Sequence, residues 1–244
     1  MDDLDLLGRQ ADTNFVVSAA GRILRTRSPD SGVGPRLYLS GCPSGNSIRI
    51  RHDVDPATAE AIERLAVGEP PMGDPETAPV HRDEYLRLLQ AEMHAERCEP
   101  GLIWTFPNRV EYDHPVPLVR SGTPEGERLV AQIREDGMPE ALFALGFLDL
   151  THFWEPWCVA LDSSQIVAIA FSACLAASAA EVGVTAVPEF RGRGFAAAAT
   201  AGWASHPALG DRTLFYSTTE ANVSSQRVAE RLALRFIGTR LSIR

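Results

Sequence analysis

Short apolar runs, separated by turns rich in glycine and proline, make up most of the first hundred residues. Such runs predict strands, and two stretches with apolar residues at helical spacing predict helices. The segment 68–79 holds four of the 17 prolines and is expected to be a loop or an internal linker. The expected strands are 14–18, 22–26, 36–40 and 47–51, and the expected helices are 57–66 and 82–97.

After a strand at 102–106 and a turn-rich passage at 108–117, strand and helix patterns alternate to the end of the chain. The expected order is a strand from 118, helices 124–135 and 139–148, strands 157–161, 166–174 and 181–187, helix 194–205, strand 213–217, helix 222–233 and strand 236–242. This order predicts an α/β fold with a mixed α+β sheet. We expect an amino-terminal α+β region at 1–110 and a second domain at 111–244.

The most apolar segment, 166–180, is about 15 residues long and contains serines, so it is expected to be buried strand and not a membrane span, which needs roughly 18 residues. The acidic start of the chain differs from the basic start of a secretory signal. The four cysteines form no Cys-x-x-Cys pair, which favours reduced thiols. A cytoplasmic location is therefore expected.

The formal net charge of −9 argues against general binding to nucleic acid or to an anionic membrane. The charge is unevenly distributed, because residues 181–244 hold eight arginines against five carboxylates. A polyanionic ligand would therefore prefer this last quarter. All 23 basic residues are arginine, which excludes chemistry that depends on a lysine.

A strand–turn–helix pattern at 181–196 carries the clearest chemistry. A β-branched run ends at Pro188, a turn with two glycines follows, and an alanine-rich helix begins. Gly192 and Gly194 would let main-chain amides approach phosphate oxygens, and Arg191 and Arg193 would add charged donors. A tight turn with no ligand is the alternative. The chain lacks the lysine of a Walker motif, and residues 214–216 hold no acid where a dinucleotide fingerprint needs one about 20 residues on.

The segment Arg191-Gly-Arg-Gly-Phe-Ala196 resembles the Arg/Gln-x-x-Gly-x-Gly/Ala signature of the GNAT superfamily of N-acetyltransferases. About 30 residues later, Asn222-Val-Ser-Ser225 and the helix after it resemble the next motif of that family. The resemblance covers 157–242 and extends to about 118. It implies a GNAT-like acetyltransferase core in the carboxyl-terminal half, preceded by a smaller α+β region.

The resemblance also implies acetyl-CoA as co-substrate, with no metal, and a set of binding residues. The pantetheine arm would lie between two splayed strands and pair with main chain of the first, and an amide near its end would face the thioester oxygen. The pyrophosphate would bind the amides at the start of the following helix. The residues implied are Ala186, Val187, Arg191, Gly192, Arg193, Gly194, Phe195, Ala196, Asn222 and Ser225.

Glu181 occupies the position of a catalytic glutamate in many relatives, and partial burial would raise its pKa toward working pH. The alternative is a solvated carboxylate at a strand end. A tyrosine that relatives place seven residues after the motif asparagine is Ala229 here. Tyr216, Thr218 or Ser225 could then donate the proton, or the thiolate could leave unaided. Ala233-Leu234 replaces the usual Gly-Phe, and a shifted helix cap is expected.

Three further clusters admit a functional or a structural interpretation. The residues around Trp154 could line an acceptor pocket or form packing beside a turn. The histidines His52 and His81, each with nearby carboxylates, resemble metal ligands at first sight. Without a third well-spaced ligand they are expected to be loop and cap residues, so no metal site is predicted.

The leading prediction is transfer of an acetyl or short acyl group from acetyl-CoA to a primary amine of a small molecule or peptide, by direct attack in a ternary complex. The first alternative is a non-catalytic acyl-CoA sensor or assembly module, since the usual tyrosine is Ala229. The second is a structural or oligomerisation protein without cofactor. The amino-terminal region would cover the acceptor side or support a homodimer.

Overall fold

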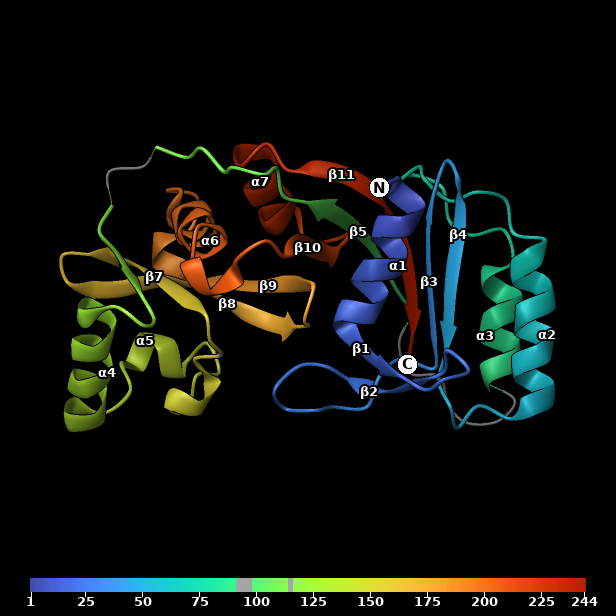
Figure 1. The fold of residues 1–244 in the computed structure, drawn as a ribbon, viewed down its shortest axis with the longest axis horizontal. Helices are drawn as coiled ribbons and strands as arrows, with labels where there is room; N and C mark the ends of the chain where they lie inside the picture. Colours follow the sequence, from blue (N-terminus) through green and yellow to red (C-terminus); the bar gives the residue numbers. More distant parts are fainter. Residues whose placement is uncertain (91–97, 114–115) are drawn as a thin grey trace.

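A nine-stranded sheet runs through the molecule. The structure is a computed structural model and describes residues 1–90, 98–113 and 116–244. Its elements lie side by side along one long axis (Figure 1). The helices are α1 (Asp3–Asn14), α2 (Pro56–Val67), α3 (Arg82–Gln90), α4 (Pro124–Asp136), α5 (Glu140–Phe143), α6 (Phe195–Ala204) and α7 (Val223–Arg231). The strands are β1 (Phe15–Val17), β2 (Ile23–Thr26), β3 (Leu37–Cys42), β4 (Gly45–Ile50), β5 (Cys98–Thr105), β6 (Leu118–Arg120), β7 (Trp157–Asp162), β8 (Gln165–Leu175), β9 (Ala179–Ala186), β10 (Thr213–Thr219) and β11 (Arg235–Ile243).

The strand order is β4-β3-β11-β5-β10-β9-β8-β7-β6, and β1 and β2 form a separate hairpin. The pairing between β9 and β10 is parallel and the other pairings in the large sheet are antiparallel. The expected mixed α/β fold is therefore confirmed. Strand β5 lies between β11 and β10, so the large sheet continues from the amino-terminal region into the rest of the chain. The division at residue 110 stays a prediction.

Alternate residues along the strands face two different cores, because side chains in a strand point to opposite faces. On one face, α6 and α7 pack on a cluster that includes Trp104, Val182 and Tyr216. On the other face, α1 packs on Ile103 and Phe215, and α4 and α5 cover the strands β7 and β8. Figure 1 shows α1 lying across the middle of the molecule, close to β3 and β11. Functional groups at the middle strands can thus act on either face.

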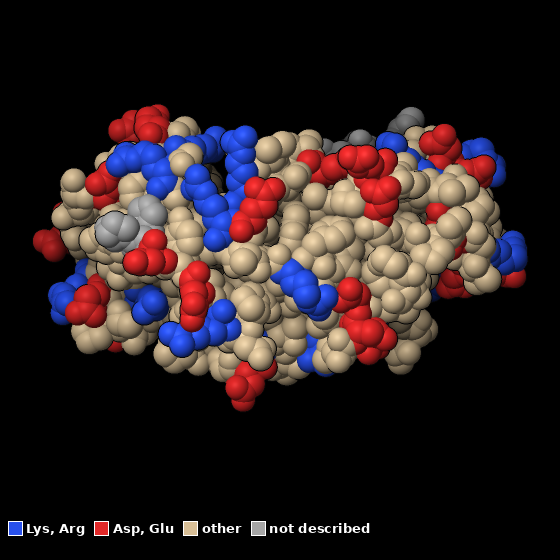
Figure 2. Space-filling view, turned by 90° about the horizontal axis from the view of Figure 1, so that it is seen from above, with Lys and Arg blue, Asp and Glu red and all other residues tan. Residues whose placement is uncertain are grey.

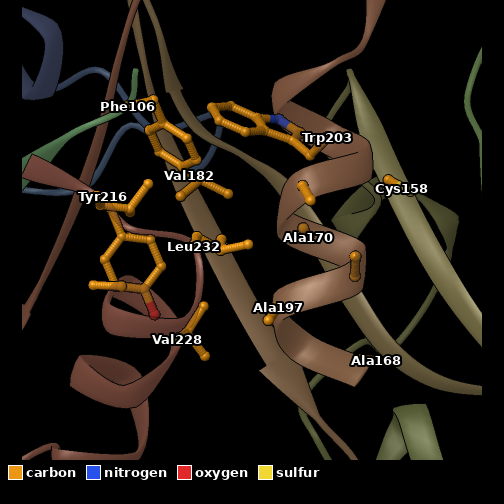
Figure 3. Packing of buried hydrophobic residues seen from close by; sticks show 14 of the residues in the cluster. Phe106, Cys158, Ala168, Ala170, Val182, Ala197, Trp203, Tyr216, Val228 and Leu232 are labelled. Carbon is orange, nitrogen blue, oxygen red and sulfur yellow. The ribbon is translucent and has the colours of Figure 1, made fainter. Parts of the chain in front are cut away.

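Helix α6 packs on the sheet through small residues. Figure 3 shows Ala197 of α6 beside Ala168 and Ala170, with Trp203 filling the space at the far end of the helix. A Cβ added at Gly202 would lie 2.4 Å from the Cys158 sulfur, so this position accepts no side chain. The close approach fixes the helix start relative to the strand that precedes it.

Helix α1 was not among the expected elements. It begins at an Asp2 cap that accepts a hydrogen bond from the Asp5 amide, and it buries Leu6, Leu7 and Gln10. The expected helix 139–148 is also shorter than predicted, since α5 ends at Phe143 and turns follow. The expected helix 82–97 begins as α3, and its last seven residues, 91–97, lie outside the described part of the chain. Within the described ranges, no helix is long and apolar enough to cross a membrane.

The end of α7 corrects the expected shift of the helix cap. Ala233 adopts a left-handed conformation with φ +50°, and the Leu234 amide donates to the Ala229 carbonyl at 3.0 Å. This is the conformation that glycine usually supplies after a helix, and alanine adopts it at a cost of about 1 kcal/mol. The cap therefore stays where a glycine would place it.

Ala233→Gly is expected to raise the free energy of unfolding by about 0.5–1 kcal/mol, because glycine adopts φ +50° without a Cβ clash. Urea denaturation of the wild type and the variant measures the difference. Ala204→Gly, inside α6, is the matched control and should destabilise by a similar amount. A destabilised Ala233→Gly variant would contradict the strain argument.

Candidate active site

Strands β9 and β10 separate after a short stretch of parallel pairing. Their register runs from Thr213 opposite Ala179 to Phe215 opposite Glu181 and then stops. Beyond that point β9 pairs with β8, and β10 pairs with β5. The two strands therefore form a V-shaped opening in the sheet, with Glu181 at its closed end.

The start of α6 lies at the outer end of β9 and forms an anion cradle. Gly192 and Gly194 have φ values of +77° and +92°, which explains why the turn needs glycine. Gly194 is the N-cap of α6, and no side chain within the described residues bonds to the helix start there. The positive end of the helix dipole therefore lies at this turn, where it favours an anion.

A pocket of about 400 Å³ lies at this turn, between the end of β9 and the start of α7. Eight of the expected cofactor residues line it: Ala186, Arg191, Gly192, Gly194, Phe195, Ala196, Asn222 and Ser225. They come from β9, the turn, α6 and the start of α7. The structure therefore brings together residues that lie up to 39 positions apart in the sequence.

Two expected residues do not line this pocket. Val187 is buried, and its amide donates to the Val167 carbonyl at 2.9 Å, so this amide is already used within the sheet. The Arg193 guanidinium bonds to Asp162 at 3.1 Å and lies over the rings of Phe190 and Phe195. The side chain of Arg193 thus stabilises the turn. A direct contact with phosphate is expected from the neighbouring residues and not from this side chain.

Two arginines of α7, Arg227 and Arg231, also line the pocket and were not predicted. Arg231 donates to the Gly192 carbonyl at 3.1 Å, which ties α7 to the glycine turn. Figure 2 looks down on the side of the molecule that carries α7 and shows basic side chains gathered left of its centre. Ser224, Arg227 and Arg231 lie three and four residues apart, so they share one face of the helix. That spacing was the available sequence signal.

Glu181 lies at the closed end of the opening, on the face covered by α1. It is only 5% exposed, and both carboxylate oxygens accept hydrogen bonds, from Ser217 Oγ at 2.6 Å and from Gln10 Nε2 at 3.0 Å. Burial raises the pKa of this carboxyl, although the bonds from Ser217 and Gln10 and the charge of Arg240 oppose the rise. The carboxylate is therefore held and buried, and not solvated at a strand end.

Tyr216 lies next to the same point but on the opposite face. Its hydroxyl is buried and has no hydrogen-bond partner among the described residues. Figure 3 shows the hydroxyl pointing toward Val228 of α7, and Val228 lines the pocket. Burial raises the pKa of Tyr216 to about 12, while the nearby Ser225 side chain acts in the opposite direction. The phenol therefore stays protonated at neutral pH.

Ala229 stands where relatives place a tyrosine, so any proton donor would come from the residues around it. Ala229 is fully buried in the same cluster as Tyr216, and it offers no proton. Asn222 caps α7 by accepting the Ser225 amide at 3.1 Å, and Asn222 is exposed beside the pocket. Thr218 is buried farther along β10 and does not line the pocket. Of the three acids considered, Ser225 lines the pocket, and Tyr216 lies behind it in the same cluster as Val228, which lines the pocket.

The remaining candidate clusters have structural roles. Asp55 caps α2, Asp53 pairs with Arg51, and His52 bonds through Nδ1 to the Ile23 carbonyl. His81 bonds to the buried Glu69, and Trp157 packs in the core beside α4 and α5. Over the described ranges, no group of three or more potential ligands could hold a metal ion.

The site thus combines a helix start after two glycines of positive φ, two strands that separate, and a buried carboxylate at their junction. Residues 156–239 match the family model described as GNAT acetyltransferase. This segment of the chain, about a third of its length, is thus similar to the GNAT acetyltransferase family. No match is found among curated proteins.

Solved structures with similar folds include proteins from several bacteria. A protein from Novosphingobium aromaticivorans assigned to the GNAT family is 22% identical with a TM-score of 0.43; the match covers 62% of this chain and 65%, less than two thirds, of that one. A GNAT-family acetyltransferase from Colwellia psychrerythraea is 13% identical, with 93% and 79% covered and a TM-score of 0.45. A GCN5-related N-acetyltransferase from Kribbella flavida is 18% identical, with 86% and 89% covered and a TM-score of 0.44.

Proposed function

We propose that the protein transfers an acetyl or short acyl group from acetyl-CoA to a primary amine, by direct attack within a ternary complex. The observation that carries the proposal is that β9 runs from the buried carboxylate of Glu181, where its pairing with β10 ends, to the pocket at the α6 start. A long ligand with a diphosphate at one end and a reactive group at the other fits this arrangement. The similarity of residues 156–239 to the GNAT acetyltransferase family supports acyl transfer.

The amides at the start of α6 would hold the pyrophosphate of acetyl-CoA, which supplies the activated acyl group. Arg191, Arg227 and Arg231 would add charge at the pocket rim. The Val187 amide bonds toward β8, so the alternating strand geometry turns the main chain of Ala186 toward the opening. Arg191 Nε, which donates to the Ala186 carbonyl at 3.3 Å, would have to give way when a ligand pairs there.

Glu181 would accept the proton of the attacking amine. An ionised carboxylate is required, and its raised pKa makes it a stronger base than a solvated glutamate. Tyr216 would donate a hydrogen bond to the leaving sulfur from the opposite face of the sheet. Because a thiolate is stable near neutral pH, this bond need not become a full proton transfer. The two groups would thus act from the two sides of the opening.

The test is release of coenzyme A from acetyl-CoA in the presence of a panel of primary amines, beside a thermal-shift measurement. Amine-dependent release together with a raised melting temperature is the expected result. Tight binding with no turnover on any amine would favour the sensor alternative, in keeping with Ala229. No thermal shift with acetyl-CoA would overturn both.

Gly192→Ala is expected to weaken acetyl-CoA binding about threefold to tenfold. A Cβ at residue 192 would meet no protein atom within 4 Å, so it would project into space that the phosphates need. Calorimetric titration with acetyl-CoA measures the effect. Gly137→Ala is the matched control, since Gly137 also has a positive φ of +88° and open surroundings but ends α4. Equal affinities of the two variants would contradict the cradle.

A further inference from the structure

Helix α1 reaches the candidate active site through the side chain of Gln10. Gln10 is fully buried, and its Nε2 donates to Glu181 Oε2 at 3.0 Å across 171 positions of sequence. Gln10 Oε1 in turn accepts from Tyr38 Oη of β3 at 2.6 Å. The three side chains form a continuous chain of hydrogen bonds from β3 through α1 to β9.

The direction of donation in this chain is fixed by chemistry. An ionised carboxylate only accepts hydrogen bonds, so the amide of Gln10 must present its nitrogen to Glu181 and its oxygen to Tyr38. Burial raises the pKa of Tyr38, which keeps its hydroxyl protonated as a donor. Tyr38 therefore holds Gln10 in the orientation that donates to the carboxylate.

We infer that Gln10, oriented by Tyr38, is a positioning residue for the catalytic base and lowers the pH at which Glu181 becomes ionised. The inference rests on the proposed role of Glu181. It makes the amino-terminal region part of the catalytic apparatus, because both Gln10 and Tyr38 belong to residues 1–110. A hydrogen bond to the charged form of a buried carboxyl favours that form.

Other groups around Glu181 also affect its ionisation and must stay constant in a test. Ser217 of β10 donates to the other oxygen, and Arg240 of β11 favours the charged form. Glu181 in turn acts on Tyr38, on Tyr216 across the sheet, and on Cys174 of β8. Arg27 and Asp30 of the β1–β2 region act on Cys174. Substitutions at Gln10 and Tyr38 leave these groups in place.

The experiment compares the wild type with Gln10→Met and Tyr38→Phe, which keep the side-chain volumes but remove the donors. In both variants the acid limb of the pH profile of kcat/KM should move upward by about one pH unit, so that the rate on that limb is up to about tenfold lower at a given pH. Thr13→Val is the control, since Thr13 is buried in the same helix but bonds only to Arg9 within it. It should leave the pH profile unchanged.

A second readout does not need turnover. Carbon NMR titration of labelled glutamates, with Glu181→Gln used to assign the signal, gives the pKa of Glu181 in each variant. An upward shift in Gln10→Met and Tyr38→Phe supports the inference, and an unchanged pKa in both overturns it. If the pKa moves but Glu181→Gln keeps full activity, the proposed base fails while the coupling stands. If Glu181→Gln loses activity and the pKa of Glu181 stays fixed, the coupling alone fails.

Discussion

Glu181→Gln is expected to slow amine acetylation by about 10²-fold or more while leaving acetyl-CoA binding intact. The carboxylate lies at the closed end of the strand opening, 5% exposed, and its raised pKa suits proton abstraction. Glutamine can keep the bonds to Ser217 and Gln10 but accepts no proton. Initial rates of coenzyme A release and the thermal shift with acetyl-CoA measure the two effects separately.

The same variant should be at least as stable as the wild type near neutral pH. A carboxyl whose pKa is raised by folding stabilises the folded state at low pH, and this contribution is lost as the pH rises through its folded pKa. Glutamine does not ionise, so the variant does not lose this stability as the pH rises. The melting temperature of the variant should therefore equal or exceed that of the wild type at pH 7, and the difference should shrink toward pH 4. In the wild type, activity should fall as the pH drops through the same pKa.

Glu189→Gln provides the matched control, because Glu189 is an exposed carboxylate just beyond β9. It should keep the wild-type rate. Equal rates in the Glu181→Gln variant and the wild type would remove Glu181 from the mechanism and leave it as a buried structural carboxylate.

The glycine turn before α6 could be predicted from the sequence because its conformation is set locally. Gly192 and Gly194 follow a β-branched strand and precede an alanine-rich helix, and the structure gives both glycines positive φ. The alternation of apolar runs likewise located most strands. The splay between β9 and β10 was expected only through the family resemblance, since no local pattern encodes where two distant strands part.

The amino-terminal part of the site escaped prediction for two different reasons. Helix α1 had a readable signal, an Asp2 cap followed by Leu4, Leu7 and Ala11 at helical spacing. The contact between Gln10 and Glu181 had none, because a buried amide finds its partner through the packing of α1 on the sheet. Tertiary contacts across 171 positions leave no trace in periodicity or composition.

Tyr216→Phe is expected to lower kcat about 10- to 10²-fold and to leave the affinity for acetyl-CoA unchanged. The buried hydroxyl makes no hydrogen bond of good geometry with the described residues, although Ser225 lies close enough to lower the pKa of the phenol, and such a poorly paired group costs the folded protein about 1 kcal/mol. Removing it should therefore raise the free energy of unfolding, as urea denaturation would measure. If the Tyr216 hydroxyl lowers the stability of the folded protein but supports turnover, its conformation serves the bound ligand.

Trp104→Phe is the control that separates the role of the hydroxyl from the role of packing. The Trp104 ring meets the Tyr216 ring edge to face, with the ring centroids 6.1 Å apart. The substitution therefore alters the packing around Tyr216 but keeps its hydroxyl. The Trp104 variant should lose stability and keep most of its kcat. If the Tyr216→Phe variant turned over as fast as the wild type, the thiolate would leave unaided. The reaction would then depend on Glu181, the proton acceptor on the α1 face, and not on a proton donor. If both variants lost the same activity, the aromatic packing of the cluster, and not the hydroxyl, would account for the effect.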